Sequence, residues 1–336
     1  MIESLLDIYS EEIPAFLYEI ADSPQMQRLK GIGMNCGCEY SSFPLFSGLE
    51  PYSRFTHSMG VGAIVWNFTH DPKQAIAGLL HDVASPAFAH VIDFMKGDYL
   101  VQESTEERTA GIIASSSQIC EVLALLGLPI GQVADYHLYP VADNDTPHLS
   151  ADRLEYTMGN ILNYRFGTLE DVARYYANLV VGKNEDGEVE LCFTSREIAE
   201  EFAFKALECG KIYVCDADRY SMQFLSEIVH SSILRGKVTE NLLYTTENQV
   251  IAALTSDEVG KADWERFRNL CAIVKTEDPS GDYPVRQISA KKRYIDPYVE
   301  GLGRVTEFSP EFKATAAEFL AEDFRYGIKG SSSDNL

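Results

Sequence analysis

The chain has 336 residues, of which 46% are hydrophobic and 24% are charged, a composition typical of a globular protein with a sizeable core and not of a disordered chain. Its 51 acidic residues outnumber its 28 basic residues and give a net charge of −23, which argues against bulk binding of nucleic acid or of an anionic membrane. The longest segment without a charged side chain, residues 55–70, carries two histidines and is shorter than the about 20 apolar residues that a membrane span needs.

Helical periodicity dominates the chain up to about residue 255. The spacing of apolar residues predicts helices over residues 57–69, 73–81, 106–125, 149–163, 169–181, 196–209, 217–235 and 246–255. A β-hairpin over 179–193 competes with the end of one of these helices, because Asp186-Gly187 suits a tight turn. A further helix is expected over 257–268, and the Pro, Gly and β-branched residues after Asp278-Pro279 indicate a few strands.

These elements predict a mainly α protein, a helical bundle with a small β-hairpin and a mixed α/β C-terminal appendage. We expect a helical domain over residues 1–245 and the appendage, packed on it, over residues 246–330. The N-terminal residues lack the basic start and long apolar run of a signal peptide, and seven unevenly spaced cysteines do not form a disulfide framework. A reduced, cytoplasmic protein is therefore expected.

The chemistry gathers around a histidine–aspartate pair, His81 and Asp82, which follows the apolar run AIAGLL. Neighbouring side chains point about 100° apart on a helix, so the two converge on one ion only at a helix end, and Pro86 marks such an end. His57 and Asp152 would complete a nitrogen and oxygen ligand set that suits Fe, Mn, Zn, Co or Ni more than Ca. The alternative is an aspartate that caps a helix beside a histidine packed in the core.

The phrases SRFTHSMGVG, AGLLHDVASPAFAHVID and SADRLEY together resemble the HD-domain metal-dependent phosphohydrolase superfamily. The upstream phrase SPQMQRLKGIG is similar to the branch that contains the deoxynucleoside triphosphate (dNTP) triphosphohydrolases, and the resemblance covers roughly residues 20–255. It implies an HD-domain helical bundle, a homo-oligomer, and one divalent transition metal with four ligands: His57, His81, Asp82 and Asp152.

The resemblance also implies which residues contact the substrate. Four positions fall where the triphosphohydrolases hold phosphates or the sugar: Arg54, His90, Arg153 and Tyr156. Asp93 falls where an acidic residue supports catalysis. Helical spacing agrees for two of these residues, because Arg54 lies three residues before His57 and Tyr156 lies four residues after Asp152. A surface ion pair or a core tyrosine is the alternative at each position.

Two departures from the family pattern affect the expected activity. The phrase HDVASPAFAH carries Ala84 and Ser85 where the family usually has glycine and histidine, and Thr105-Glu106 stands where it usually has His-Glu. Since that second histidine is the family's usual acid, we expect weak or absent dNTP hydrolysis. Glu106 could replace it if burial raised its pKa, although an acidic first helical turn is the simpler interpretation. The candidate catalytic residues are Asp82, His90, Asp93 and Glu106.

The sequence thus predicts a metal-dependent phosphohydrolase acting on a nucleotide or related phosphate ester, with a dNTP as one candidate. A nucleotidase or phosphodiesterase acting on a smaller ester is the first alternative, and a catalytically weak regulatory protein that binds nucleotides is the second. A second metal on His137 and His148 is not expected, because Thr105 stands where the first extra histidine usually lies. The compact basic cluster at residues 291–293 indicates a solvated loop, with contact to an anionic ligand or a neighbouring subunit as the alternative.

Overall fold

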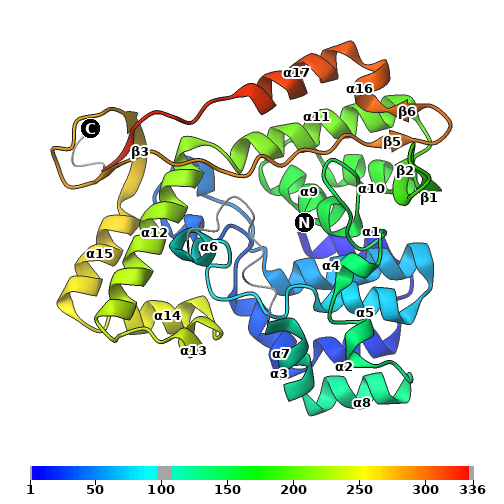
Figure 1. Ribbon diagram of the computed structural model, residues 1–336, viewed down its shortest axis with the longest axis horizontal. Coiled ribbons are helices and arrows are strands. Elements are labelled where there is room, and N and C mark those ends of the chain that lie inside the picture. The colour runs from blue at the N-terminus through cyan, green and yellow to red at the C-terminus, as the bar shows by residue number, and fades with distance from the viewer. Residues whose placement is uncertain (1, 97–107, 333–336) are drawn as a thin grey trace.

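Helices make up most of the molecule, and the strands form two small sheets, which confirms the predicted mainly α fold (Figure 1). The structure is a computed structural model that describes residues 2–96 and 108–332. The helices before the hairpin are α1 (Leu5–Tyr9), α2 (Ala15–Ala21), α3 (Pro24–Gln27), α4 (Arg54–Thr69), α5 (Pro72–Leu80), α6 (Val91–Lys96), α7 (Thr109–Ser115), α8 (Ser117–Leu125), α9 (Ala151–Asn163) and α10 (Leu169–Ala177). Those after it are α11 (Arg196–Ile212), α12 (Asp216–Leu234), α13 (Glu240–Leu243), α14 (Glu247–Leu254), α15 (Glu258–Arg268), α16 (Val305–Phe308) and α17 (Pro310–Ala321).

The strands join segments that are far apart in the sequence. One sheet has the order β1-β2-β5-β6, with strands β1 (Leu179–Lys183), β2 (Val189–Phe193), β5 (Tyr298–Val299) and β6 (Gly303–Arg304). The other has the order β3-β7-β4, with strands β3 (Leu270–Lys275), β7 (Ile328–Ser332) and β4 (Val285–Arg286). Strands β1 and β2 form the predicted antiparallel hairpin with Val181 opposite Leu191, and β2 pairs in parallel with β5. The C-terminal part of the chain is thus tied to the hairpin.

Two boundaries differ from the prediction. The helix expected over 106–125 is divided, because Ser116 adopts an extended conformation between α7 and α8 and its hydroxyl accepts a hydrogen bond from the backbone NH of Ile119. That serine acts as the N-cap of a new helix. The helix expected over 169–181 ends at Ala177, since the following residues form β1. Strands β4 and β5 lie in the segment where the composition indicated strands, and helix α17 follows it.

Two hydrophobic cores organise the molecule, and neither corresponds to one continuous stretch of chain. The first combines residues of α1 to α5 and α7 to α11 with residues 295–324, and it includes the fully buried Tyr9, Tyr175 and Phe312. The second combines residues 36–46 and 87–94 with residues 220–288 and Ile328. The chain therefore passes between the cores several times. The domain boundary expected near residue 245 stays a prediction.

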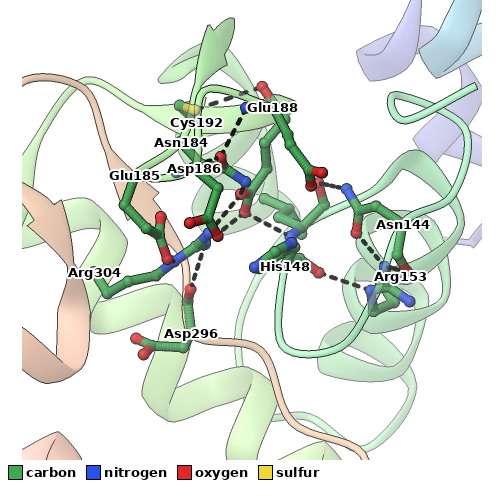
Figure 2. Close-up of polar contacts among 12 residues, drawn as sticks. Asn144, His148, Arg153, Asn184, Glu185, Asp186, Glu188, Cys192, Asp296 and Arg304 are labelled. Atoms are coloured by element: carbon green, nitrogen blue, oxygen red, sulfur yellow. Dashed lines mark hydrogen bonds and ion pairs between the residues drawn. The ribbon is translucent and has the colours of Figure 1, made fainter.

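An ion-pair network fixes the hairpin to the C-terminal part of the chain (Figure 2). The Arg304 guanidinium donates to both carboxylate oxygens of the fully buried Glu190 at 2.7 and 2.8 Å, and to Glu185 at 2.8 Å. Its Nη1 also donates to the carbonyl of Asp296 at 3.1 Å. Because two parallel bonds join guanidinium and carboxylate, the pair fixes orientation as well as distance.

Among the described residues, none of the helices is both long and apolar enough to cross a membrane.

Candidate metal centre

His57, His81 and Asp152 form a compact group of ligand-type side chains that come from three different helices. His57 Nε2 lies 3.1 Å from His81 Nε2 and 3.0 Å from Asp152 Oδ1, and His81 Nε2 lies 3.7 Å from the same oxygen. All three ligand atoms lie within 4.8 Å of one another. Two imidazole nitrogens and a carboxylate oxygen form a donor set that suits a divalent transition metal. The residues present therefore fit such an ion.

The local sequence explains why these side chains meet. Ser53 and Ser150 are the N-caps of α4 and α9, and each hydroxyl accepts a hydrogen bond from a backbone NH of the first helical turn. His57 and Asp152 therefore lie in first turns, where a carboxylate also interacts favourably with the helix dipole. Helix α5 ends at Leu80, and His81 is its C-cap residue. His81 thus reaches the group from the end of α5, whereas its neighbour Asp82 is not one of the three residues.

Hydrogen bonds to the far nitrogens orient both imidazoles. His81 Nδ1 lies 2.7 Å from the carbonyl oxygen of Gly78, and His57 Nδ1 lies 2.5 Å from Glu155 Oε2. Both partners are acceptors, so each Nδ1 carries a proton and each Nε2 faces the group. Protein metal sites commonly show this arrangement, because the outer acceptor fixes the tautomer and makes the ligand more basic.

Glu155 and Tyr52 belong to the site although the sequence analysis did not select them. Both are almost fully buried, and the Tyr52 hydroxyl donates a hydrogen bond to Glu155 Oε2. Glycine is needed at position 60 of α4, because a Cβ atom there would lie 2.6 Å from the Glu155 side chain. The available signal was spacing, since Glu155 follows Asp152 by three residues and so lies on the same face of its helix.

Removing the charge of Glu155 is expected to weaken metal binding. Glu155→Gln keeps the shape of the side chain but replaces the carboxylate beside His57 with a neutral amide. We expect metal affinity to fall by about 10- to 100-fold, the range found for outer-sphere partners of metal-bound histidines. Competition with a chelator measures the change. Glu170→Gln, at an exposed glutamate of α10, is the control and should match the wild type. Equal affinities for the two variants would show that Glu155 does not support the ligand.

His57 and Asp152 carry opposite charges at neutral pH. Burial opposes a charge on His57, yet its hydrogen bonds to Asp152 and Glu155 raise its pKa to about 10. Burial acts to raise the pKa of Asp152, but the hydrogen bond from His57 and the nearby His81 lower it to about 2. Asp152 is therefore ionised at neutral pH, as a metal ligand must be, whereas binding of a metal would displace a proton from His57 Nε2.

Asp82, the fourth predicted ligand, lies beside the group. Its Oδ2 is 3.6 Å from His81 Nε2, and its two oxygens accept hydrogen bonds from Arg54 Nη1 at 2.8 and 2.6 Å. Ser85, the departure from the family pattern, donates to Oδ1 at 2.7 Å. Although burial works in the opposite direction, Arg54 and the histidines hold the pKa of Asp82 well below its usual range. The structure thus places Arg54 on an acidic side chain of the protein itself.

His90 and Asp93 form a second pair in the same pocket. His90 Nδ1 lies 2.9 Å from Oδ2 of the fully buried Asp93. Burial lowers the pKa of His90 although Asp93 opposes this effect, so the imidazole is neutral at neutral pH. Phe88 and Ala89, directly before it, have positive φ angles of 63° and 43°, a conformation that costs non-glycine residues about 1–3 kcal/mol each. Phe88 is fully buried in the second core, and this packing maintains the turn.

The predicted substrate residues all line one pocket of about 990 Å³, together with the metal-centre residues. The Tyr156 ring centroid lies 6.4 Å from that of His57. Arg153 is engaged by the protein itself: Nε donates to the carbonyl of His148 at 2.7 Å, Nη1 lies 3.1 Å from Asp143 Oδ1, and Nη2 donates to Asn144 (Figure 2). Its guanidinium therefore holds the loop before α9. Glu106 lies outside the described residues.

Three further residues of the pocket wall bear on the prediction. His137 pairs with Asp143 at 2.9 Å and is not part of the group formed by His57, His81 and Asp152. Lys291 and Arg293, which the sequence analysis assigned to a solvated loop, line this pocket and are half-buried. Their alternate positions in the chain were a usable signal, because side chains two residues apart share a face in an extended segment.

Comparison with known proteins identifies distant relatives, although no protein-family model matches the chain. The chain is 24% identical over 254 residues to the uncharacterized protein YdhJ of Bacillus subtilis, and the aligned region covers 75% of this chain and 74% of that protein. It is 27% identical over 179 residues to the metal-dependent phosphohydrolase cns2 of Cordyceps militaris, which covers 52% of this chain and 49% of that protein. A hypothetical protein from Aquifex aeolicus shares the fold, with a TM-score of 0.61 and 18% identity over 95% of this chain and 93% of its own.

Proposed function

We propose that this protein is a metal-dependent phosphohydrolase whose one divalent transition metal binds His57, His81 and Asp152, with Asp82 beside them. The observation that carries the proposal is the convergence of the two Nε2 atoms and a carboxylate oxygen within 4.8 Å, with both Nδ1 atoms held by acceptors. The similarity to a protein named metal-dependent phosphohydrolase supports it. So does the resemblance of the phrases around these residues to the HD superfamily.

The protein's own side chains have distinct roles in this proposal. A divalent metal bound here supplies a Lewis acid that lowers the pKa of a bound water molecule and polarises a phosphoryl oxygen. Asp82 remains ionised and orients the attacking water, since Arg54 and Ser85 fix its carboxylate. His90 exchanges a proton with the reacting groups, because its neutral ring is held by Asp93 through Nδ1.

We propose a nucleotide or a related phosphate ester as the substrate. The pocket volume of about 990 Å³ lies at the upper end of the roughly 300–1,000 Å³ found for small-molecule sites. Its wall carries several aromatic rings that suit the flat faces of a base: Tyr136, Tyr156, Tyr164 and Tyr213. A dNTP is the candidate given by the sequence resemblance, and Ser85 and Thr105 lead us to expect slow turnover of it.

Phosphate release tests the proposal directly. The metal-stripped protein is incubated with a panel of nucleoside mono-, di- and triphosphates and simple phosphate esters, with and without Mn²⁺, Fe²⁺ or Co²⁺. We expect release only after a metal is added, and loss of release when a chelator is present. Release that is unaffected by stripping would contradict the proposal. Tight metal and nucleotide binding without any release would favour the regulatory alternative, in which Arg54 keeps Asp82 from acting on water.

A further inference from the structure

The segment that joins β4 to β5 crosses the molecule from the second core to the first and passes along α11 (Figure 1). Within it, Lys291 and Arg293 line the pocket of the proposed metal centre. Lys292, between them, is directed elsewhere: its Nζ donates to the carbonyl oxygens of Leu320 and Glu322, both at 2.6 Å. Successive side chains of the basic cluster therefore point in different directions. Lys291 and Arg293 lie on the pocket side, and Lys292 binds the end of α17.

The segment is held on both sides of the two cations. Before them, the buried Ile288 accepts a hydrogen bond through its carbonyl from the fully buried Arg219. After them, the backbone NH of Asp296 donates to the carbonyl of Pro147 at 3.0 Å, and its own carbonyl accepts from Arg304 at 3.1 Å. A segment fixed in this way presents its side chains at a defined position.

The backbone of Arg293 packs directly against Gly210 of α11. A Cβ atom at Gly210 would lie 2.5 Å from the Arg293 carbonyl oxygen. This distance is too short for any side chain at position 210, so the segment would have to move away from the helix. Glycine at this position thus allows Arg293 to approach the pocket, and the position provides a way to displace Arg293 without altering its charge.

The two cations change the charge balance of the pocket. Four cationic side chains of the described residues line it: Arg54, Arg153, Lys291 and Arg293. Arg54 binds Asp82, and Arg153 binds the loop before α9. Burial raises the pKa of Tyr156 and Asp218 and lowers that of His90, and the nearby positive charge of Arg293 acts to lower the pKa of each; Tyr156 and His90 are proposed site residues. Its positive potential thus reaches the region where substrate would lie.

We propose that Arg293 and Lys291 bind phosphate oxygens of the substrate, with Arg293 as the principal contact. This inference rests on the proposed function, and it gives the C-terminal part of the chain a role in anion binding. A guanidinium offers two parallel donors to a phosphate group, whereas the Lys291 ammonium acts as a point charge. The substrate is therefore an anion with phosphate oxygens beyond those that the metal centre holds, as in a nucleoside diphosphate or triphosphate.

The experiment compares Arg293→Gln with the matched neighbour Lys292→Gln, both loaded with Mn²⁺ and freed of excess metal. Calorimetric titration with inorganic pyrophosphate measures the anion affinity, and thermal unfolding and metal content report on the fold. A charge-assisted hydrogen bond corresponds to a roughly 10- to 100-fold change in affinity, so we expect Arg293→Gln to raise the Kd for pyrophosphate by that factor. Lys292→Gln should stay within about twofold of the wild type, and Arg293→Lys should recover part of the loss.

Kinetics with the best substrate of the phosphate-release panel give a second readout. We expect Arg293→Gln to raise KM more than it lowers kcat, and Gly210→Ala to raise KM in the same direction with all charges retained. Absence of pyrophosphate binding by the wild type, equal affinities of wild type and Arg293→Gln, or the same loss in Lys292→Gln would overturn the inference. So would a loss in Arg293→Gln that parallels lost metal content or a lower Tm. Failure of the proposed function is distinguishable, because it would be absent phosphate release while pyrophosphate binding still depended on Arg293.

Discussion

Replacing His81 or Asp152 with alanine is expected to lower the affinity for a divalent transition metal by about 100-fold or more, beyond the 10- to 100-fold typical of outer-sphere partners. Each substitution removes one of three atoms that lie within 4.8 Å of one another, and two remaining donors hold an ion poorly. Elemental analysis of the purified variants, after dialysis against a weak chelator, measures the retained metal. Phosphate release should fall with it.

His137→Ala is the matched control for these variants. His137 lines the same pocket but pairs with Asp143 and lies outside the group of three. Its metal content should equal that of the wild type. If His81→Ala and Asp152→Ala retained as much metal as His137→Ala, the centre would have to lie elsewhere in the molecule.

Breaking the buried pair of Arg304 and Glu190 is expected to destabilise the protein strongly. Arg304→Met leaves the Glu190 carboxylate buried without its cation, and removing one partner of a buried ion pair costs about 3–5 kcal/mol. The double variant Arg304→Met/Glu190→Leu removes both charges and should recover much of the loss, although Leu149 and Asn184 also lose an acceptor. Urea unfolding, followed by fluorescence and circular dichroism, measures the change in the unfolding free energy.

The exposed pair of Arg325 and Asp323 provides the comparison. Since water screens such a pair, Arg325→Met should change the unfolding free energy by less than about 1 kcal/mol. Similar effects of Arg304→Met and Arg325→Met would mean that the buried network in Figure 2 does not hold the hairpin to the C-terminal part of the chain.

Local patterns predicted most helices and the hairpin, because an amphipathic period and a turn dipeptide are both encoded within a few residues. They did not predict the break at Ser116, where the serine hydroxyl accepts a backbone hydrogen bond as the N-cap of a new helix. Nor did they predict that residues 36–46 pack with residues 220–288, because such packing depends on the whole fold. Helix α17 lies within the appendage that was expected to be mixed α/β, although no separate helix was predicted at its residues.

The residues proposed for the metal centre each stand within a distinctive phrase of the sequence, and the structure brings His57, His81 and Asp152 together. The roles of the cations could not be found in this way. Arg54 and Arg153 were placed by motif, yet only the structure shows that their guanidinium groups bind acidic and carbonyl groups of the protein. Conversely, no local pattern connects Arg293 with a histidine that precedes it by more than two hundred residues.

The path of the C-terminal segment has a consequence for the newly made chain. Synthesis proceeds from the N-terminus, so the three grouped ligand residues are all present once residue 152 has been added. The wall that carries Lys291 and Arg293 follows much later, and Arg304, which fixes it, later still. A nascent or proteolytically shortened chain that lacks this segment therefore carries the three proposed ligand residues without the part of the pocket wall that Lys291 and Arg293 form.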